Sequence, residues 1–243
     1  MSRLSYYLSV LKAAAHRGET DDANKEALVA QITSQTQSGD IDAIIDVIDD
    51  FGKRTSFLMN IGDEKGILLE DAIRRAQPRQ ILELGAFCGY SGLRIARAMP
   101  VEARLHSIEL NPFNAGIATR IWQHAGVHDR VSAVLGSIED GQTIERLHTE
   151  FGFTPGSVDF LFIDHAHSRY LPDLLLILQA GLLHPGTVVF ADNVKIPGAP
   201  EYLAYMREHE GGQWSTITYK THLEYQLFVP DLVLESTYRG QTS

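Results

Sequence analysis

The sequence predicts an α/β fold: a doubly wound, mostly parallel sheet of seven strands, preceded by helices and completed by an antiparallel hairpin. From residue 79 onward, short runs rich in β-branched residues alternate with amphipathic helices, which is the pattern of a parallel sheet covered on both faces. Near the end, two extended runs are separated by too little chain for a crossover helix, so they should pair antiparallel. With 243 residues, 44% of them hydrophobic, the chain can fill one core, and we expect a single domain over 1–243.

The first 76 residues are expected to form a helical cap region, because apolar residues recur there at helical intervals. The expected helices cover 4–15, 24–35, 41–51 and 65–76. In the third helix, we interpret Asp46, Asp49 and Asp50 as a solvated acidic face rather than a metal site. The basic runs at 74–75 and 94–97 are likewise interpreted as solvated helix faces.

The α/β core is expected over 79–243, where strands and helices alternate along the chain. The expected parallel strands are 81–86, 104–110, 131–137, 158–165 and 187–193. The helices between them are expected at 91–99, 112–125, 142–151 and 170–183. A last helix at 201–210 then leads into the two extended runs, 214–220 and 223–238, which form the hairpin.

Composition argues against several classes of partner. A formal net charge of −10 disfavours nucleic acid, because phosphate binding needs clustered Lys and Arg. The single cysteine, Cys88, excludes an internal disulfide and fits a reducing compartment. We find no secretory signal and no run of about 18 apolar residues, and the amphipathic start is better explained as a packed helix than as a membrane-surface segment. We therefore expect a cytoplasmic protein with a small-molecule partner, and neither a nucleic-acid nor a membrane partner.

A glycine-rich turn connects the first strand to the next helix and points to a nucleotide-type cofactor. Gly85, Gly89 and Gly92 do not have the G-x-G-x-x-G spacing that a dinucleotide pyrophosphate needs. Glu83 begins the turn, and its carboxylate suits the cationic amino-acid portion of S-adenosylmethionine better than a pyrophosphate. Glu109, at the end of the second strand, can accept hydrogen bonds from ribose hydroxyls in either nucleotide class. S-adenosylmethionine is therefore favoured, although such a turn is common in doubly wound folds.

Polar residues at the ends of the fourth and fifth strands predict a metal site. Because the carboxyl ends of adjoining parallel strands share one edge of the sheet, Asp164, Asp192 and Asn193 should lie close together. Their oxygens suit magnesium, and the missing thiolates disfavour zinc. Two alternatives stay open. Asp164 with His165 and His167 could form an iron site, although these residues are too close in sequence for a relaxed facial arrangement, or Asp164 could cap a helix while Asp192 begins a turn.

Several stretches, in order from about residue 50 to the end, resemble the catechol O-methyltransferase family. They are SFLMNIGDEKG (56–66), ILELGAFCGYSG (81–92), IELNP (108–112), FIDHAHSRYLPD (162–173), GTVVFADNVKIPGAPEYLAY (186–205) and HLEY (222–225). Generic methyltransferases share the glycine turn but not the stretches around Asp164, Asp192 and Glu224. The resemblance implies a Rossmann-like fold and a magnesium-dependent transfer of the methyl group of S-adenosylmethionine to one hydroxyl of a catechol.

The resemblance also implies roles for individual residues. Magnesium would be held by Asp164, Asp192 and Asn193. The cofactor would be bound by Met59, Ile61, Glu83, Gly85, Tyr90, Ser91, Glu109, Leu110, Ile138, Glu139, Asp164 and His165. The substrate would be bound by Phe57, Ala166, His167, Asn193, Pro197, Leu223 and Glu224. Of these, Glu224 would bind the hydroxyl that is not methylated, and His167 and Glu224 would be the catalytic residues.

The chain departs from the family at positions that bear on catalysis and specificity. His167 stands where the family has a lysine base, and its ordinary pKa near 6.5 leaves it neutral and able to accept a proton at pH 7. The rate should then fall as His167 is protonated. Ala166 and Phe57 stand where the family usually has tryptophans, so the slot should be roomier and admit larger catechols or polyphenols. Lys195 replaces an apolar residue and is better explained as a solvated lysine than as a contact for acidic catechols.

Two other functions remain as alternatives. A magnesium-dependent methyltransferase of another vicinal dihydroxy-aromatic, such as a phenylpropanoid ester or a natural product, would keep the fold and cofactor but change the acceptor. A non-catalytic S-adenosylmethionine-binding regulator would have no use for the metal residues. The physiological catechol, the choice between its two hydroxyls and the oligomeric state do not follow from the sequence.

Overall fold

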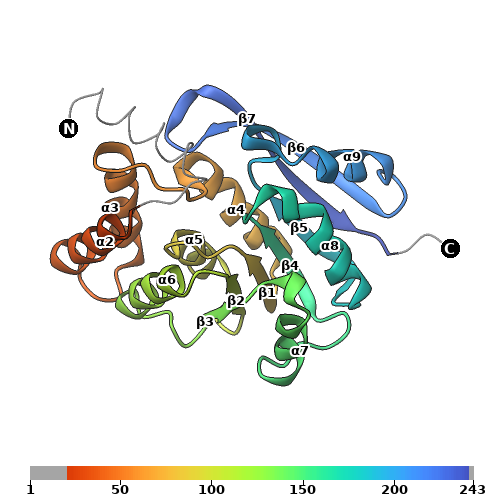
Figure 1. The fold of residues 1–243 in the computed structure, drawn as a ribbon, viewed down its shortest axis with the longest axis horizontal. Helices are drawn as coiled ribbons and strands as arrows, with labels where there is room; N and C mark the ends of the chain where they lie inside the picture. The colour runs from red at the N-terminus through yellow and green to blue at the C-terminus, as the bar shows by residue number, and fades with distance from the viewer. Residues whose placement is uncertain (1–20, 241–243) are drawn as a thin grey trace.

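The computed structural model describes residues 21–240 and places their strands in one sheet, in the order β3-β2-β1-β4-β5-β7-β6 (Figure 1). The strands are β1 (Gln80–Leu84), β2 (Arg104–Glu109), β3 (Val131–Leu135), β4 (Val158–Ile163), β5 (Leu183–Ala191), β6 (Trp214–Leu223) and β7 (Gln226–Tyr238). β1 to β5 run parallel, whereas β7 pairs antiparallel with both β5 and β6. The predicted mostly parallel seven-stranded sheet with an antiparallel hairpin is confirmed.

Helices cover both faces of this sheet and form two hydrophobic clusters (Figure 1). One face is covered by α2 (Asp22–Gln35), α3 (Ile41–Arg54), α4 (Gly62–Ala76), α5 (Tyr90–Ala98) and α6 (Pro112–His124). The other face is covered by α7 (Gln142–Thr149), α8 (Tyr170–Gln179) and α9 (Pro200–Glu208). The predicted helix at 4–15 lies outside the described residues. Within the described part of the chain, no helix combines the length and apolarity that a membrane span requires.

Residue chemistry explains where these helices begin. Asp21 and Asp40 cap α2 and α3, because their carboxylates accept hydrogen bonds from the backbone N–H groups of Ala23 and Ala43. Asn111 caps α6 in the same way, and the following Pro112 suits the first helical position, where no intrahelical N–H bond is needed. These caps place the helix starts within a few residues of the predicted ones.

Three predicted boundaries differ from the structure by three or four residues. β5 begins at Leu183, not 187, because Val158 pairs with Leu183 before a register irregularity carries the strand past Pro185 and Gly186. α8 consequently ends at Gln179, earlier than predicted. At the hairpin, Glu224 and Tyr225 form the turn, so β7 begins at Gln226 rather than 223. Glu224 thus projects from a turn, next to α4, rather than from a strand.

The interpretation of the acidic and basic helix faces is wrong at two positions. Asp46, Arg74 and Arg75 are exposed as expected, but Asp49 and Arg94 are buried. Asp49 accepts a hydrogen bond of 2.6 Å from the hydroxyl of Tyr90, and its pKa is raised because burial disfavours the charged form. Arg94 donates to Glu70 at 2.9 Å and to the Tyr90 hydroxyl. Helical periodicity places both residues on solvated faces, but α3, α4 and α5 pack around them.

We therefore predict that replacing Arg94 by methionine, which keeps the apolar stem, lowers the free energy of unfolding by about 3–5 kcal/mol, because Glu70 loses a buried partner. The matched control is Arg74→Met. Arg74 also binds Glu70, at 3.0 Å, but its side chain is 49% exposed compared with 5% for Arg94, so its loss should cost below about 1 kcal/mol. Urea unfolding at pH 7 measures both values, and equal losses would contradict the burial argument.

Candidate active site

A cavity of about 780 Å³ lies at the carboxyl edge of the parallel strands. It begins where β1, β2, β4 and β5 end, and the loop before α4 and the β6–β7 turn also line it. The predicted site residues that line it are Phe57, Met59, Gly85, Glu109, Leu110, Ile138, Glu139, Asp164, His165, Ala166, His167, Asn193, Pro197, Leu223 and Glu224. These lining residues include some predicted for the cofactor and some predicted for the substrate, and they border one continuous space.

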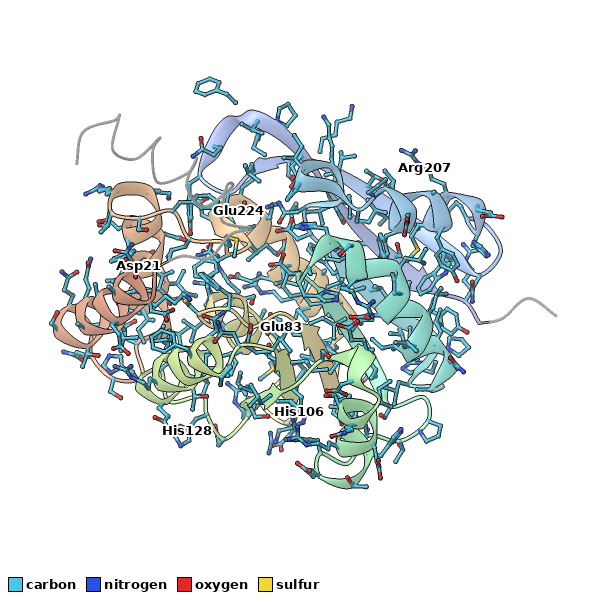
Figure 2. All side chains as sticks on the ribbon, viewed as in Figure 1. Asp21, Glu83, His106, His128, Arg207 and Glu224 are labelled. Carbon is cyan, nitrogen blue, oxygen red and sulfur yellow. The ribbon has the colours of Figure 1, made fainter. Side chains whose placement is uncertain are left out.

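Five predicted residues do not line this cavity: Ile61, Glu83, Tyr90, Ser91 and Asp192. All five are buried. Tyr90 has a structural role, because its hydroxyl is part of the interior network with Asp49 and Arg94. Glu83 lies in the middle of the molecule, among the strands, whereas Glu224 lies at the hairpin turn beside α4 (Figure 2).

The glycine turn after β1 is shaped by contacts between parts of the protein itself. Gly85 has a φ of +102°, and a Cβ there would overlap the backbone carbonyl of Asp164, so only glycine lets the β1 and β4 ends approach this closely. A Cβ on Gly89 or Gly92 would lie 2.7 Å from the ring of Trp122. Trp122 also donates a hydrogen bond of 2.8 Å to the Gly89 carbonyl. Gly89 and Gly92 therefore serve helix packing rather than the ligand approach that the sequence suggested.

Glu83 is a fully buried carboxylate without a well-formed hydrogen bond to either oxygen among residues 21–240. Burial raises its pKa to about 7, and the nearby Ser107 and Ser91 hydroxyls oppose this effect only in part. A buried carboxyl left in this state is costly unless a donor or a cation satisfies it. The ammonium group of an amino-acid ligand would do so.

Glu109 at the end of β2 ties together two loops that border the cavity. Its two carboxylate oxygens accept hydrogen bonds of 2.8 Å from the backbone N–H groups of Phe87 and Asn111. Phe87 has a φ of +45°, which is uncommon outside glycine, and the bond from its N–H to Glu109 holds the turn in that conformation. Glu109 therefore orders the glycine turn as well as facing the cavity.

The predicted metal residues lie where β4 and β5 end. Burial together with the charges of Asp192 and Glu224 raises the pKa of Asp164 well above its ordinary value. Asp192 is fully buried: its Oδ1 accepts from the backbone N–H of Asn193 at 2.7 Å, while its Oδ2 has no partner in the described part of the chain. Asn193 adopts the left-handed conformation with a φ of +51°. Strain of this kind is concentrated at functional sites.

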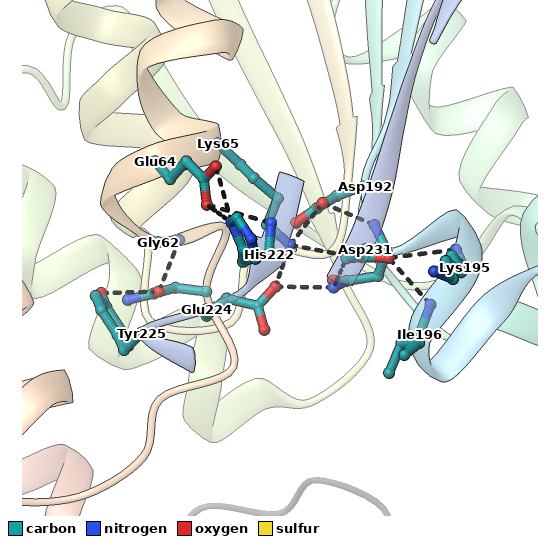
Figure 3. Close-up of polar contacts among 12 residues, drawn as sticks. Gly62, Glu64, Lys65, Asp192, Lys195, Ile196, His222, Glu224, Tyr225 and Asp231 are labelled. Carbon is teal, nitrogen blue, oxygen red and sulfur yellow. Dashed lines mark hydrogen bonds and ion pairs between the residues drawn. The ribbon is translucent and has the colours of Figure 1, made fainter. Parts of the chain in front are cut away.

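A fully buried ammonium, that of Lys65 from α4, lies against these residues (Figure 3). It contacts Asp192 Oδ1 at 2.8 Å and Asp231 Oδ2 at 3.3 Å, and it also binds Glu224 Oε1. Asp192, Glu224 and Asp231 form the one group of described acidic, histidine or cysteine residues whose side-chain atoms converge as metal ligands would. One ammonium can balance only one of the carboxylates Asp164, Asp192, Glu224 and Asp231, so a further cation would be needed for all four to ionise together, which agrees with the raised pKa of Asp164.

The two histidines after β4 have different surroundings. His165 Nε2 lies 2.9 Å from Asp173 Oδ2, and its ring stacks on Tyr170. The ring of His167 also stacks on Tyr170, with centroids 5.1 Å apart, and its Nε2 is buried without a partner among residues 21–240. Desolvation, aided by His165, lowers the pKa of His167 to about 4. Neither histidine converges with Asp164 in the described structure, which argues against the iron alternative.

Sequence reasoning missed three residues that organise the site: Lys65, Asp173 and Asp231. Asp173 holds both His165 and Arg169, at 2.9 and 2.7 Å. Lys65 lies within one of the stretches that resemble the family and Asp231 lies near another, but neither follows the end of a parallel strand, so the strand-end pattern does not predict them. A polar residue at a position that should be buried, such as Asp231 in β7, was the available clue.

Comparison with known proteins agrees with this arrangement. Residues 35–200 match the sequence model of a family described as O-methyltransferase. A probable O-methyltransferase of Mycobacterium tuberculosis is 54% identical over 224 residues, which cover 92% of this chain and 95% of that protein. Catechol O-methyltransferase B of Danio rerio is 40% identical over 85% of this chain and 76% of its own length, and the Mus musculus catechol O-methyltransferase is 36% identical over 90% and 80%.

Solved structures support the fold. An O-methyltransferase from Bacillus cereus in complex with SAH aligns with a TM-score of 0.65, at 18% identity, over 96% of this chain and 98% of that one. The O-methyltransferase of tomaymycin synthesis from Streptomyces achromogenes, in complex with SAM, aligns with a TM-score of 0.64, at 20% identity, over 99% and 100%. From the family match and the identity to its relatives, the chain belongs to the O-methyltransferase family.

Proposed function

We propose that this O-methyltransferase transfers the methyl group of S-adenosylmethionine to one hydroxyl of a catechol-type substrate, with magnesium bound by Asp164, Asp192 and Asn193. One observation carries the proposal: Asp192 Oδ2 is buried without a partner in the described residues, at a carboxylate-rich edge of the cavity that Asp164 and Asn193 line. The catechol O-methyltransferases of Danio rerio and Mus musculus, at 40% and 36% identity, support the choice of acceptor.

The residues at the glycine turn fit the methyl donor. The buried Glu83 carboxylate can pair with the donor's ammonium group, and Ser91, close to it in α5, can bind the donor's carboxylate end. Glu109 faces the cavity and can accept from the ribose hydroxyls. Around the adenine we place Leu110, Ile138 and Glu139, all of which line the same space.

The oxygen donors at the sheet edge fit magnesium, which prefers carboxylate and amide oxygens. A divalent cation there would stabilise a phenolate and so lower the pKa of a hydroxyl that ordinarily titrates near 10. The side chains would position the two reactants. Holding the reacting oxygen in line with the methyl group can lower the activation barrier by up to roughly 7–11 kcal/mol. The excess of carboxylates over ammonium groups in this region favours the binding of such a cation.

His167 is the proposed base. It lines the cavity, its Nε2 is free of other described partners, and Tyr170 holds its ring by stacking. Its pKa of about 4 keeps it neutral at pH 7, so it can accept the hydroxyl proton without first losing one. The ordinary histidine pKa near 6.5 predicts protonation at that pH, and burial lowers the pKa so that His167 is protonated only at a lower pH.

The acceptor slot is formed by Phe57, Ala166, Pro197 and Leu223, with Glu224 at one end. Because Glu224 Oε1 is occupied by Lys65 and Asn193, Oε2 remains for the hydroxyl that is not methylated. The small side chain of Ala166 leaves room for substituents larger than a single ring. The alternative acceptors, phenylpropanoid esters or other vicinal dihydroxy-aromatics, share this slot and must be separated by assay.

The proposed function predicts labelled methyl transfer from S-adenosylmethionine to a catechol panel running from simple catechol to a bulky flavonoid. Chelation should lower the rate at least about 100-fold, because the phenolate loses its stabilising cation, and added magnesium should restore it. Donor binding, measured by calorimetry, should survive chelation. Full turnover with chelator would exclude the metal role, and labelling of none of the catechols would exclude the acceptor class. A preference for simple catechol over the flavonoid would argue against the roomy slot.

A second prediction concerns His167. His167→Ala should lower kcat about 10²–10⁴-fold, with unchanged donor affinity, because the base is lost. At saturating donor, the wild-type kcat should stay level from pH 7 down to 5.5, since a base with a pKa of about 4 remains neutral over that range. The matched control is His184→Ala, at the opposite end of β5, which should keep full turnover. A tenfold decline of wild-type kcat between pH 7 and 5.5 would contradict the lowered pKa.

A third prediction concerns the buried carboxyl of Glu83. Its raised pKa of about 7 means that it is protonated below neutral pH in the ligand-free protein, and it must ionise to pair with an ammonium group. Donor affinity should therefore rise with pH from 5.5 and level off near 7, by up to about tenfold per pH unit. Calorimetry on Glu83→Gln should give weak binding without this slope. The control Glu109→Gln should weaken binding but keep the slope, and a wild-type affinity independent of pH would refute the assignment.

A further inference from the structure

Lys65 and Asp231 form a salt cluster with Asp192 and Glu224, but the proposed reaction gives neither Lys65 nor Asp231 a role. The members of this cluster come from α4, the end of β5, the β6–β7 turn and β7, and Lys65, Asp192 and Asp231 have fully buried side chains (Figure 3). Burying such charges carries a desolvation cost of several kcal/mol per ion, and apolar residues of similar volume often pack as stably. The contacts of each member indicate what this arrangement accomplishes.

Asp231 uses both of its oxygens within the protein. Its Oδ1 accepts from the backbone N–H groups of Lys195 at 3.3 Å and Ile196 at 3.0 Å. Its Oδ2 accepts from Lys65 Nζ at 3.3 Å and from the amide nitrogen of Asn193 at 2.9 Å. Asp231 therefore holds the chain that follows β5 rather than offering an oxygen to a cation.

The same cluster sets the direction of the Asn193 side chain. Its amide nitrogen donates to Asp231 Oδ2 and to Glu224 Oε1, both at 2.9 Å. Because the amide is planar, its oxygen must point away from these two carboxylates. The left-handed backbone conformation of Asn193 directs its side chain toward Asp231 and Glu224. Asp231 also binds the backbone N–H groups of Lys195 and Ile196, which follow Asn193 in the chain.

Lys65 acts on the two flanking carboxylates in a similar way. It occupies Asp192 Oδ1 and Glu224 Oε1, so that each carboxylate keeps its other oxygen. For Asp192 that other oxygen, Oδ2, is buried without a partner within the described structure. The cluster thus occupies Asp192 Oδ1, Glu224 Oε1 and the amide nitrogen of Asn193. The second oxygen of each carboxylate and the amide oxygen of Asn193 are left for ligands.

We propose that Lys65 and Asp231 are positioning residues for the ligands of the divalent cation, because they determine which oxygens of Asp192, Asn193 and Glu224 are left without a protein partner. This inference rests on the proposed function, which supplies the cation and the acceptor. Partners behind metal ligands orient them, and their loss typically lowers metal affinity about 10–100-fold. Lys65 and Asp231 need not touch the cation to have this effect.

The test measures metal binding in the absence of donor and acceptor, so it does not depend on turnover. Mn²⁺ is titrated into the folded protein, and the concentration of free Mn²⁺ is measured by electron paramagnetic resonance. Asp231→Asn keeps the shape of the side chain, but its amide nitrogen would meet Lys65 and Asn193, which are both donors. The Asn193 amide should then turn, and Mn²⁺ affinity should fall about 10–100-fold. Lys65→Met, which removes the ammonium from Asp192 and Glu224, should weaken binding comparably.

Two controls separate positioning from folding. Glu235→Gln removes a carboxylate from the same strand, β7, where Glu235 accepts from Arg75 and Tyr219 away from the site, and it should leave Mn²⁺ affinity unchanged. Donor affinity should be preserved in Asp231→Asn, which shows that the variant is folded. If Asp231→Asn does not fold, the comparison is made with Lys65→Arg, which keeps the charge and should retain more affinity than Lys65→Met.

The outcomes distinguish the two proposals. Equal Mn²⁺ affinity in wild type, Asp231→Asn and Lys65→Met, with catechol methylation intact, would overturn the positioning role alone. Mn²⁺ binding that weakens in the variants, without methylation of any catechol by the wild type, would support positioning and overturn the proposed acceptor. A wild type that binds no Mn²⁺ but methylates catechols would overturn both the metal role and the positioning role.

Discussion

The antiparallel pairing of β7 with β5 concentrates negative charge at one point of the sheet edge, and the site depends on how that charge is balanced. A purely parallel sheet would bring Asp164 and Asp192 together through adjoining strand ends. The hairpin adds Glu224 from its turn and Asp231 from β7. Carboxylates at this density repel one another unless cations lie between them. Lys65 supplies a permanent cation from within the protein, and the proposed magnesium supplies the rest.

The helical region before the sheet helps to hold the same edge. Tyr225 follows Glu224 in the hairpin turn. Its hydroxyl lies 3.0 Å from Asp49 Oδ1 in α3 and 3.0 Å from Asn60 Oδ1 in the loop before α4, within hydrogen-bonding distance of both. Asn60 also accepts from the backbone N–H of Gly62, and Lys65 lies one turn further along α4. Through the Tyr225 hydroxyl, the buried Asp49 therefore connects α3 to the β6–β7 turn and to the loop before α4, both of which border the cavity. The first helices are in this sense part of the active site, although Asp49 does not line the cavity.

The sequence predicted the parts of the structure that local chemistry determines. Strand order and the hairpin followed from alternating patterns and connection lengths, and Asp164, Glu109 and Asn193 were found because they follow strand ends. Lys65 could not be found that way, since its partners Glu224 and Asp231 are 159 and 166 residues further along the chain. Periodicity likewise placed Asp49 and Arg94 on exposed faces, although both are buried. The residue pattern of one helix does not show whether another helix packs against its polar face.

The histidine at position 167 is consistent with this charge balance. A lysine base would have to be deprotonated to act, and the Asp231 carboxylate, which acts on position 167, would stabilise its charged form. A neutral imidazole avoids the conflict, since it adds no charge to a region that already contains the Lys65 ammonium and is proposed to bind a divalent cation. Burial, together with His165, lowers the pKa of His167 and keeps it neutral at the cost of basicity. A weak base of this kind accepts a proton effectively only where the acceptor hydroxyl is itself acidified, so the proposed base and the proposed metal depend on each other.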